Sequence, residues 1–580
     1  MNSRPSSSRT LSIVALAASA TIALAIDPQW LELKALQDQI RENAHALREN
    51  AALLALFGER IPTGKNAELD AARTKRDAAD QALKNVEETL VGEKRKGLQA
   101  AQKARDDAVD ALYSEYPWYG KKLDDIARLT AEVEKTEANK KELSLSELKA
   151  LRQAKRELGS LGGEIYELRR IWWERDPAKP LYEKAKVLYE AFGREKGRKE
   201  IRDAEGKAKE ARRELQAVAE KAALETKVGK GIEEENTKLD AQQKELRAKI
   251  PAMEEQVTGG KWTAHTVKTP SPYKDKDGKQ REMTTTISIP PGCEKVRGLF
   301  VGYWGSLIGD TFVRAGCRKV GMAIVRFEGF DGLFNYTNNV PQCMDVALEK
   351  VGQISKHPEI RYAPFLSGGM STTVIGARNM AYWQAVRAIG VIHVAGGNMH
   401  QHRPDPSRTL AGVPFFAANG EFEVFGPEGG IRPEYGRQTQ WIMMREQMYR
   451  MMAKDRNHLM FLMVQPGGDH GGWDRDLSIL AGLFVIKATE RRVPTDAPTD
   501  KPVKCMRIPP EDGWLIDSDI YTPQFEPAPY KDYKGDKQKA FWVFDEEMAR
   551  AVTAYHKDKF FMPDLSKKYP VPSDWPPAPR

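Results

Sequence analysis

The chain has 580 residues, more than a single ordinary hydrophobic core accommodates, so we expect more than one folded unit. Its 90 basic and 82 acidic residues give a net charge of +8, with both signs mixed along the whole length. Nucleic-acid-binding proteins usually concentrate basic residues on one face, so this distribution argues against a nucleic-acid partner.

The first 25 residues have the pattern of a secretory signal peptide. Arg4 and Arg9 give a positive start, residues 11–25 are apolar, and Ala23-Leu24-Ala25 has the small-x-small form of a cleavage site. The apolar run is shorter than the roughly 20 residues that a membrane span needs, although an uncleaved anchor is the alternative. We therefore expect a secreted or periplasmic protein.

Residues 26–257 are rich in Ala, Leu, Glu, Lys, Arg and Gln, the composition of charged helices. Apolar residues at alternating spacings of three and four form two heptad-like seams, one from Leu33 to Leu54 and one from Leu151 to Trp172. The first seam includes Asn43 and Asn50, and such polar residues can fix register. Breakers at residues 58–65, 116–118 and 176–180 divide the region into several helices. We expect antiparallel hairpins, with an intermolecular coiled coil as the alternative, and a role in self-association or surface attachment.

Residues 258–490 alternate short apolar runs with helical segments, which predicts a mostly parallel sheet covered on both faces. The expected strands are 284–289, 297–304, 321–327, 363–366, 389–395, 413–418 and 459–464. The expected helices are a short one ending near 313, then 340–354, 372–387, 437–454 and 474–489. Residues 491–580 are rich in Pro, Asp and Lys, and we expect them to wrap this domain with one short helix at 545–556.

Gly369-Met370-Ser371 ends an apolar strand just before a helix-forming segment, which is the pattern of a nucleophile elbow. Ser371 is therefore the candidate nucleophile. The small residue usual two positions after the serine is replaced by Thr373. Ser367 is the competing serine, but Phe365 stands two positions before it and it lies at the strand end.

A serine hydroxyl needs an adjacent base to become a nucleophile. His470 is the candidate, because it follows the strand 459–464 in a glycine-rich loop. The base needs a carboxylate that holds its tautomer, and that acid should follow the preceding strand. Glu423 is the favoured acid, with Glu421 and then Glu428 as alternatives.

With these residues in place, positions from about 284 to 490 resemble an α/β-hydrolase domain, close to the esterase branch that includes secreted feruloyl and polyester-depolymerising types. The motifs that carry the resemblance are Gly369-Met370-Ser371, Gly420-Glu421-Phe422-Glu423 and Asp469-His470-Gly471. The chain departs from that branch at Glu423, where aspartate is usual, and at Thr373.

The resemblance implies a serine hydrolase that cleaves a carboxylic ester through an acyl-enzyme on Ser371. It also implies an oxyanion hole, with the backbone N–H of Thr372 as one donor and a group near Trp304 or Gly305 as the other. The alternatives are a structural or binding protein with an inactive hydrolase-like domain, and a serine peptidase of the same fold.

Neither a cofactor nor a metal is expected. His400 and His402 form an H-x-H pair with Asp405 nearby, but no further residue in the sequence completes a ligand shell. In an exported protein the four cysteines could form up to two disulfides, of which Cys317–Cys343 is the favoured pair and free thiols are the alternative. The other cysteines are Cys293 and Cys505.

Overall fold

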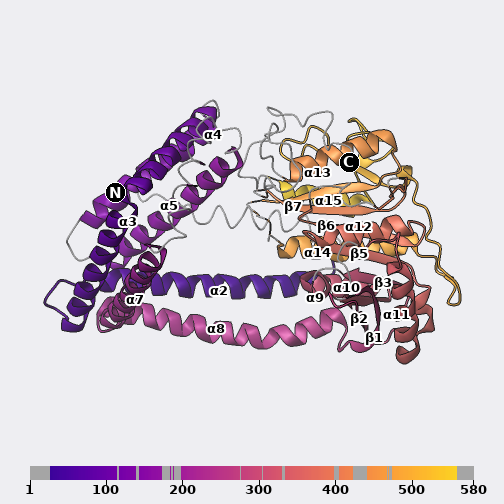
Figure 1. Ribbon diagram of the computed structural model, residues 1–580, viewed down its shortest axis with the longest axis horizontal. Coiled ribbons are helices and arrows are strands. Elements are labelled where there is room, and N and C mark those ends of the chain that lie inside the picture. The colour runs from indigo at the N-terminus through magenta and orange to yellow at the C-terminus, as the bar shows by residue number, and fades with distance from the viewer. Residues whose placement is uncertain are drawn as a thin grey trace, which may run out of the picture. The chain divides into compact units, whose positions relative to one another are not determined.

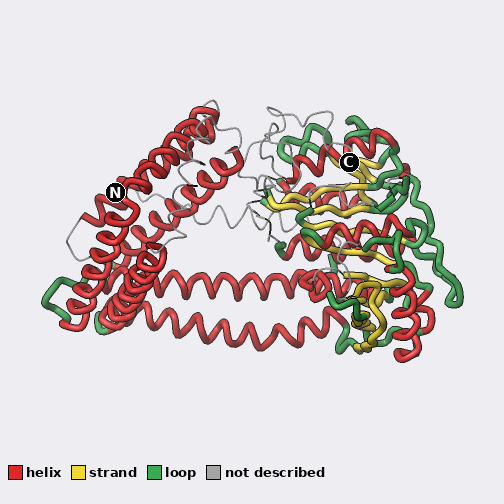
Figure 2. The backbone as a smooth tube through the Cα atoms, viewed as in Figure 1, coloured by secondary structure: helices red, strands yellow, loops and turns green. Residues whose placement is uncertain are grey.

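The computed structural model describes most of the chain in two compact units. Its described residues are 26–113, 117–138, 143–172, 183, 187, 197–274, 276–302, 305–329, 334–396, 404–405, 407–421, 423, 440–466, 468, 470 and 473–557. Residues 36–249 form a helical unit, and the described residues before and after them form a sheet unit. Among these residues, Figure 2 shows strands in the sheet unit alone.

In the described part of the region that was expected to be helical, the structure has six long helices (Figure 1). They are α2 (Pro28–Gly58), α3 (Ala67–Tyr113), α4 (Pro117–Ala138), α5 (Leu145–Trp172), α7 (Gly197–Leu224) and α8 (Lys227–Thr258). Helices α3 and α7 run antiparallel and are joined by ion pairs, Lys221 to Glu68 at 2.7 Å and Arg212 to Asp80 at 2.9 Å. The unit boundaries fall within α2 and α8, so each of these helices contributes turns to both units.

Described residues of the two predicted seams pack together inside this chain. Leu54 of the first seam lies in the same apolar cluster as Leu151 and Ala154 of the second. The amide of Asn50 donates a 2.8 Å hydrogen bond to the Asn236 side chain, which pairs the polar seam position of α2 with α8. These contacts are of the kind that the expected helical hairpins require.

Helix boundaries follow the breakers where the structure describes them. Helix α2 ends at Gly58, and α4 begins at Pro117. The breaker at 176–180 lies outside the described residues. Two further breaks, between α4 and α5 and between α7 and α8, were not predicted. At each of them, a side-chain hydroxyl caps the start of the next helix. Ser144 and Glu147 form a capping box at the start of α5, and the Thr226 hydroxyl accepts from the Gly229 amide at the start of α8.

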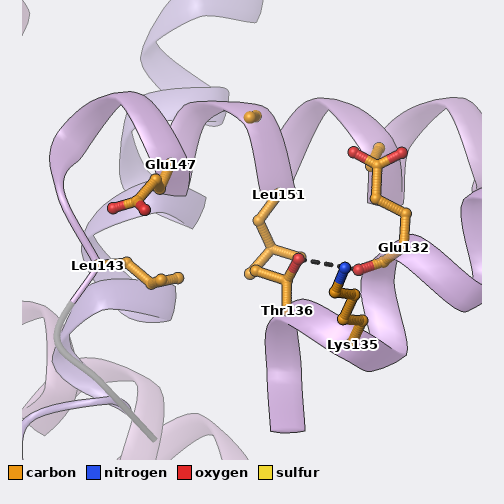
Figure 3. A pocket seen from close by; sticks show the side chains of 8 residues that line it. Glu132, Lys135, Thr136, Leu143, Glu147 and Leu151 are labelled. Carbon is orange, nitrogen blue, oxygen red and sulfur yellow. Dashed lines mark hydrogen bonds between the residues drawn. The ribbon is translucent and has the colours of Figure 1, made fainter. Parts of the chain in front are cut away.

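A hollow of about 450 Å³ lies between α4 and α5 in the helical unit (Figure 3). Leu143 and Leu151 line it with apolar surface, while Glu132, Lys135 and Glu147 supply charged groups. The Thr136 hydroxyl is bound to the Glu132 carbonyl oxygen at 2.8 Å, so it is already engaged within its own helix.

The sheet unit is built on eight strands in the order β1-β2-β4-β3-β5-β6-β7-β8. Their bounds are β1 (Thr263–Lys274), β2 (Gln280–Ile289), β3 (Gly298–Gly302), β4 (Met322–Glu328), β5 (Phe365–Met370), β6 (Ala388–Val394), β7 (Phe415–Gly420) and β8 (Met460–Gln465). Strand β2 pairs antiparallel with β1 and β4. The remaining neighbours in the sheet, from β4 through β3, β5, β6 and β7 to β8, pair in parallel. This order confirms the expected α/β-hydrolase fold. Strand β1 was not predicted, because it is a half-exposed edge strand whose sequence lacks an apolar run.

Helices connect the parallel strands and flank the sheet (Figure 1). They are α9 (Gly305–Gly309), α10 (Thr311–Lys319), α11 (Val340–Ser355), α12 (Thr373–Trp383), α13 (Gln440–Lys454) and α14 (Arg475–Arg492). Helices α10 and α14 approach so closely that a Cβ on Gly316 would lie 2.5 Å from the Gly482 carbonyl oxygen. The start of α2 packs on this pair through Trp30, whose ring centroid lies 5.8 Å from that of Phe312.

Helix α12 ends four residues before the predicted boundary at 387. Gln384 has an extended φ of −139°, and the guanidinium of Arg387 donates to the carbonyl oxygens of Arg361 at 3.1 Å and Ala363 at 2.9 Å. These bonds hold the turn that leads into β6, so the last positions of the helical sequence pattern serve as a connection.

The described part of the C-terminal stretch packs along the last strand of the sheet. It contains a small sheet of β9 (Trp514–Ile516), β10 (Ala528–Pro529) and β11 (Phe541–Val543), followed by α15 (Glu546–His556). The His556 ring accepts a 3.0 Å hydrogen bond from the Val464 amide of β8, and the Tyr555 hydroxyl donates to Asp474 at 2.7 Å. The open edge of the sheet is thereby covered, as edge strands require.

All four cysteines are free thiols, so the favoured Cys317–Cys343 disulfide is wrong. Cys317 lies buried on α10, and desolvation raises the pKa of its thiol. Among the described residues, no helix has both the length and the apolar character that crossing a membrane requires. The predicted signal peptide at residues 1–25 lies outside the described part.

His393 is a buried titratable group in the centre of the sheet. It lies on β6, paired with Gly369 of β5 and Ala417 of β7, and neither of its ring nitrogens has a partner among the described residues. Burial, aided by the charge of Arg378, holds the pKa of His393 well below its usual value of 6.5. The folded protein therefore binds fewer protons here than the unfolded chain does.

This difference predicts that folding stability falls as the pH drops below about 6.5, the ordinary histidine value. Between pH 7.5 and 5.5, His393 should account for a loss of at most about 1.4 kcal/mol, the weight of one pH unit below the unfolded pKa when the folded ring stays neutral. Urea unfolding at both pH values should show this loss in the wild type and a smaller one in His393→Phe. Equal losses in the two proteins would contradict the prediction.

Candidate active site

Ser371 lies on a sharp turn between the end of β5 at Met370 and the start of α12 at Thr373. Its φ is +55°, a left-handed backbone that costs a non-glycine residue roughly 1–2 kcal/mol. The Ser371 amide donates a 2.9 Å hydrogen bond to the carbonyl oxygen of Val394, which ties the turn to β6. A Cβ on Gly369 would lie 2.5 Å from the Thr373 carbonyl oxygen, so this position needs glycine.

The surroundings of the competing serine, Ser367, exclude it as a candidate nucleophile. Ser367 is fully buried, and its hydroxyl donates a 2.6 Å hydrogen bond to the carbonyl oxygen of Ala377. Ser371 is partly exposed, as a group that meets a substrate must be. The fold therefore separates two serines that lie only four positions apart in the sequence.

His470 joins Ser371 to Glu423. Its Nε2 lies 2.8 Å from the Ser371 Oγ, and its Nδ1 lies 2.6 Å from the Glu423 Oε1. Both distances are within the range of about 2.6–3.2 Å expected between a catalytic base and its partners. Because a carboxylate only accepts hydrogen bonds, the ring proton belongs on Nδ1, and Nε2 is free to accept from the serine hydroxyl.

The second oxygen of Glu423 is also engaged. It accepts hydrogen bonds from the Asn419 side-chain amide at 3.0 Å and from the Gly420 backbone amide at 3.2 Å. Glu423 is only 1% exposed, so its carboxylate has lost its contacts with water. The hydrogen bonds from Asn419, Gly420 and His470 compensate for that loss. The Gln440 amide donates to the Glu423 carbonyl oxygen at 2.7 Å, which fixes the backbone of this residue.

The alternative acids lie elsewhere. Glu421 is fully buried, and its carboxylate accepts from the Tyr521 hydroxyl at 3.4 Å, while its amide donates to the Gln465 carbonyl oxygen. Glu428 lies outside the described residues. Glu423 is thus the acid that the fold brings within hydrogen-bond distance of His470. The glutamate that stands where aspartate is usual thus reaches the ring, with its Oε1 2.6 Å from Nδ1.

Thr372, one of the two expected oxyanion donors, is exposed and directly follows Ser371. Its amide has no acceptor among the described residues, so the N–H is available to a ligand. Trp304, the other expected donor, lies outside the described residues, and Gly305 opens α9.

Helix α9 is anchored by two close packing contacts at the strand ends. A Cβ on Gly368 would lie 2.6 Å from Leu307, and one on Gly302 would overlap Ile308 at 1.6 Å. These glycines let α9 settle directly on β3 and β5, beside the serine turn. Helix α9 therefore packs against the strand β5 that leads to Ser371.

Asn419 was not singled out in the sequence, although it binds the acid. It lies on β7 at 3% exposure, and its amide also reaches the Gly396 carbonyl oxygen at 3.4 Å. A signal was present, since Asn419 is a polar residue that directly follows the apolar run 413–418. Sequence pattern alone does not show which carboxylate such a residue supports.

The H-x-H pair at His400 and His402 lies outside the described residues. The Asp405 carboxylate accepts from Ser407 and Arg408, which lowers the pKa of Asp405. Across the part of the chain that the structure describes, no group of three or more His, Cys, Asp or Glu side chains is arranged to hold a metal ion.

Solved structures similar to this chain are serine hydrolases, esterases and lipases. An α/β serine hydrolase homologue from Coxiella burnetii is 13% identical, with 38% of this chain and 96% of that chain covered and a TM-score of 0.25. An S-formylglutathione hydrolase from Agrobacterium tumefaciens is 14% identical, with 40% and 95% covered and a TM-score of 0.27. Lipase A from Candida antarctica is 6% identical, with 44% and 83% covered and a TM-score of 0.28.

No protein-family model and no curated protein matches the chain. The fold class rests on the strand order and the antiparallel β2, and the site rests on its own distances.

Proposed function

We propose that this protein is a serine hydrolase that cleaves a carboxylic ester. The observation that carries the proposal is the position of His470, which bridges the Ser371 hydroxyl at 2.8 Å and the Glu423 carboxylate at 2.6 Å. A nucleophile, a base and an orienting acid in hydrogen-bonded series are the arrangement that acyl transfer to a serine requires.

In the first half of the reaction, the Ser371 Oγ bonds to the ester carbonyl carbon while its proton moves to Nε2 of His470. The Glu423 carboxylate holds the ring and stabilises the imidazolium that forms. The amide of Thr372 faces the negative charge that develops on the carbonyl oxygen, with the α9 segment as the source of the second donor. His470 then gives its proton to the leaving alcohol, and the acyl group stays on Ser371.

In the second half, water replaces the alcohol. His470 takes a proton from the water as its oxygen bonds to the acyl carbon, and returns that proton to the Ser371 Oγ as the ester bond to the enzyme breaks. The products are a carboxylic acid and a regenerated serine. An ester is the preferred substrate class because the chain resembles an esterase branch, whereas a peptide bond would make the enzyme a peptidase.

The N-terminal pattern supports export of this enzyme to the periplasm or the medium. Cleavage after Ala25 would leave a mature chain that begins at Ile26, just before α2. Part of both seams packs within the helical unit, so self-association or attachment to a surface would use its charged outer faces.

A fluorophosphonate probe tests the central step, because it reacts with an activated serine and with no other group of the triad. We expect stoichiometric labelling of the wild type, loss of labelling in Ser371→Ala, and retained labelling in Ser367→Ala, which removes the buried competing serine. Short p-nitrophenyl esters should be hydrolysed, and matched peptide anilides should not. A folded wild type that is neither labelled nor active would contradict the proposal and favour a binding protein.

The two buried glutamates provide a matched pair of variants. Glu423→Gln should lower kcat by about 10³–10⁴, the scale seen when the acid of such a triad loses its charge. Glu421→Gln removes an equally buried charge that does not orient His470, so its kcat should remain within a few-fold of the wild type. Steady-state kinetics on one ester substrate compares them, and a larger loss in Glu421→Gln would show that the acid is misassigned.

Export predicts a processed N-terminus. N-terminal sequencing of the protein recovered outside the cytoplasm should give a chain that begins near Ile26, since the cleavage site lies at residues 23–25. A recovered protein that retains Met1 would contradict cleavage and favour the uncleaved anchor.

A further inference from the structure

Thr373 occupies the position where an elbow of the expected type has a small residue, and its hydroxyl is bonded on both sides. It donates a 2.7 Å hydrogen bond to the Met370 carbonyl oxygen and accepts a 2.9 Å bond from the Met370 amide. Both partners belong to the residue directly before Ser371. The hydroxyl therefore closes a ring of contacts around the serine turn.

The backbone of Ser371 is the part of this turn that needs support. Its φ of +55° is disfavoured for a residue with a side chain, and such conformations persist where surrounding contacts determine them fully. The Ser371 amide is bound to Val394 on one side of the turn, and the Ser371 carbonyl oxygen accepts from the Val374 amide at 3.1 Å. Thr373 adds a link between the first turn of α12 and the last residue of β5.

Packing leaves room for a side chain at 373 because the close contact lies elsewhere. The tight approach beneath the turn is between Gly369 and the backbone of Thr373, not its side chain. The threonine side chain is only partly buried and turns back toward Met370. A glycine at 373 would satisfy the packing but would remove both hydrogen bonds.

We propose that Thr373 is a positioning residue for catalysis, whose hydroxyl holds the Ser371 turn so that Oγ stays in line with His470 and the Thr372 amide stays directed at the oxyanion. The inference rests on the proposed serine hydrolase function. It gives the departure from the usual G-x-S-x-G pattern a role, since a hydroxyl bridge replaces the flexibility of glycine with a fixed geometry.

Three substitutions separate the hydroxyl from the shape of the side chain. Thr373→Val keeps the shape and removes the hydroxyl, Thr373→Ser keeps the hydroxyl, and Thr373→Gly restores the usual small residue. We expect the rate of fluorophosphonate labelling and kcat to fall about tenfold in the valine and glycine variants. A tenfold fall corresponds to an activation free energy that is higher by about 1.4 kcal/mol. The serine variant should stay within about twofold, and KM should be unchanged in all three because the hydroxyl does not contact substrate.

Each outcome bears on one of the two proposals. If the wild type is labelled and the valine variant is labelled equally fast, Thr373 does not position the turn, and the hydrolase function stands. If all three variants lose activity in proportion to their melting temperatures, with no rescue by serine, the role is structural and the inference fails. If the folded wild type is not labelled at all, the hydrolase function fails and this inference falls with it.

Discussion

The left-handed turn at Ser371 is the constraint on which the rest of the site depends. A strand must end and a helix must begin within two residues, and the side chain between them must remain outside. The required φ is unfavourable for serine, so the fold offsets it with a glycine at 369, a bond to β6 and the hydroxyl of Thr373.

The remaining parts of the site are arranged around that turn by the parallel sheet. Strands β5, β7 and β8 end at the same edge, and Ser371, Glu423 and His470 lie in the segments that follow these strands. Glu423 can be buried because Asn419, Gly420 and His470 bind both of its oxygens. The partly exposed His470 is thus anchored by a fixed carboxylate, which is how a loop residue gains a defined orientation.

Hydrophobic periodicity predicted the fold well because buried parallel strands are short apolar runs and buried helices carry regular apolar stripes. Strands 321–327, 389–395 and 459–464 correspond closely to β4, β6 and β8. The method failed at β1, an edge strand with polar residues on its exposed side, and at the end of α12, where Arg387 binds loop carbonyl oxygens. In both places tertiary contacts, rather than a local pattern, set the structure.

The sequence by itself determined the order of serine, acid and histidine and the strand that each follows, because glycine-rich turns after apolar runs are local features. It also indicated Ser371 over Ser367 and Glu423 over Glu421. Only the tertiary structure decided these choices, since burial and hydrogen bonding depend on residues far away in the chain. Ser367 is hydrogen-bonded to Ala377, Glu421 accepts a hydrogen bond from Tyr521, and Glu423 is hydrogen-bonded to His470. The cysteines show the same limit, because spacing cannot report the distance between two thiols in space.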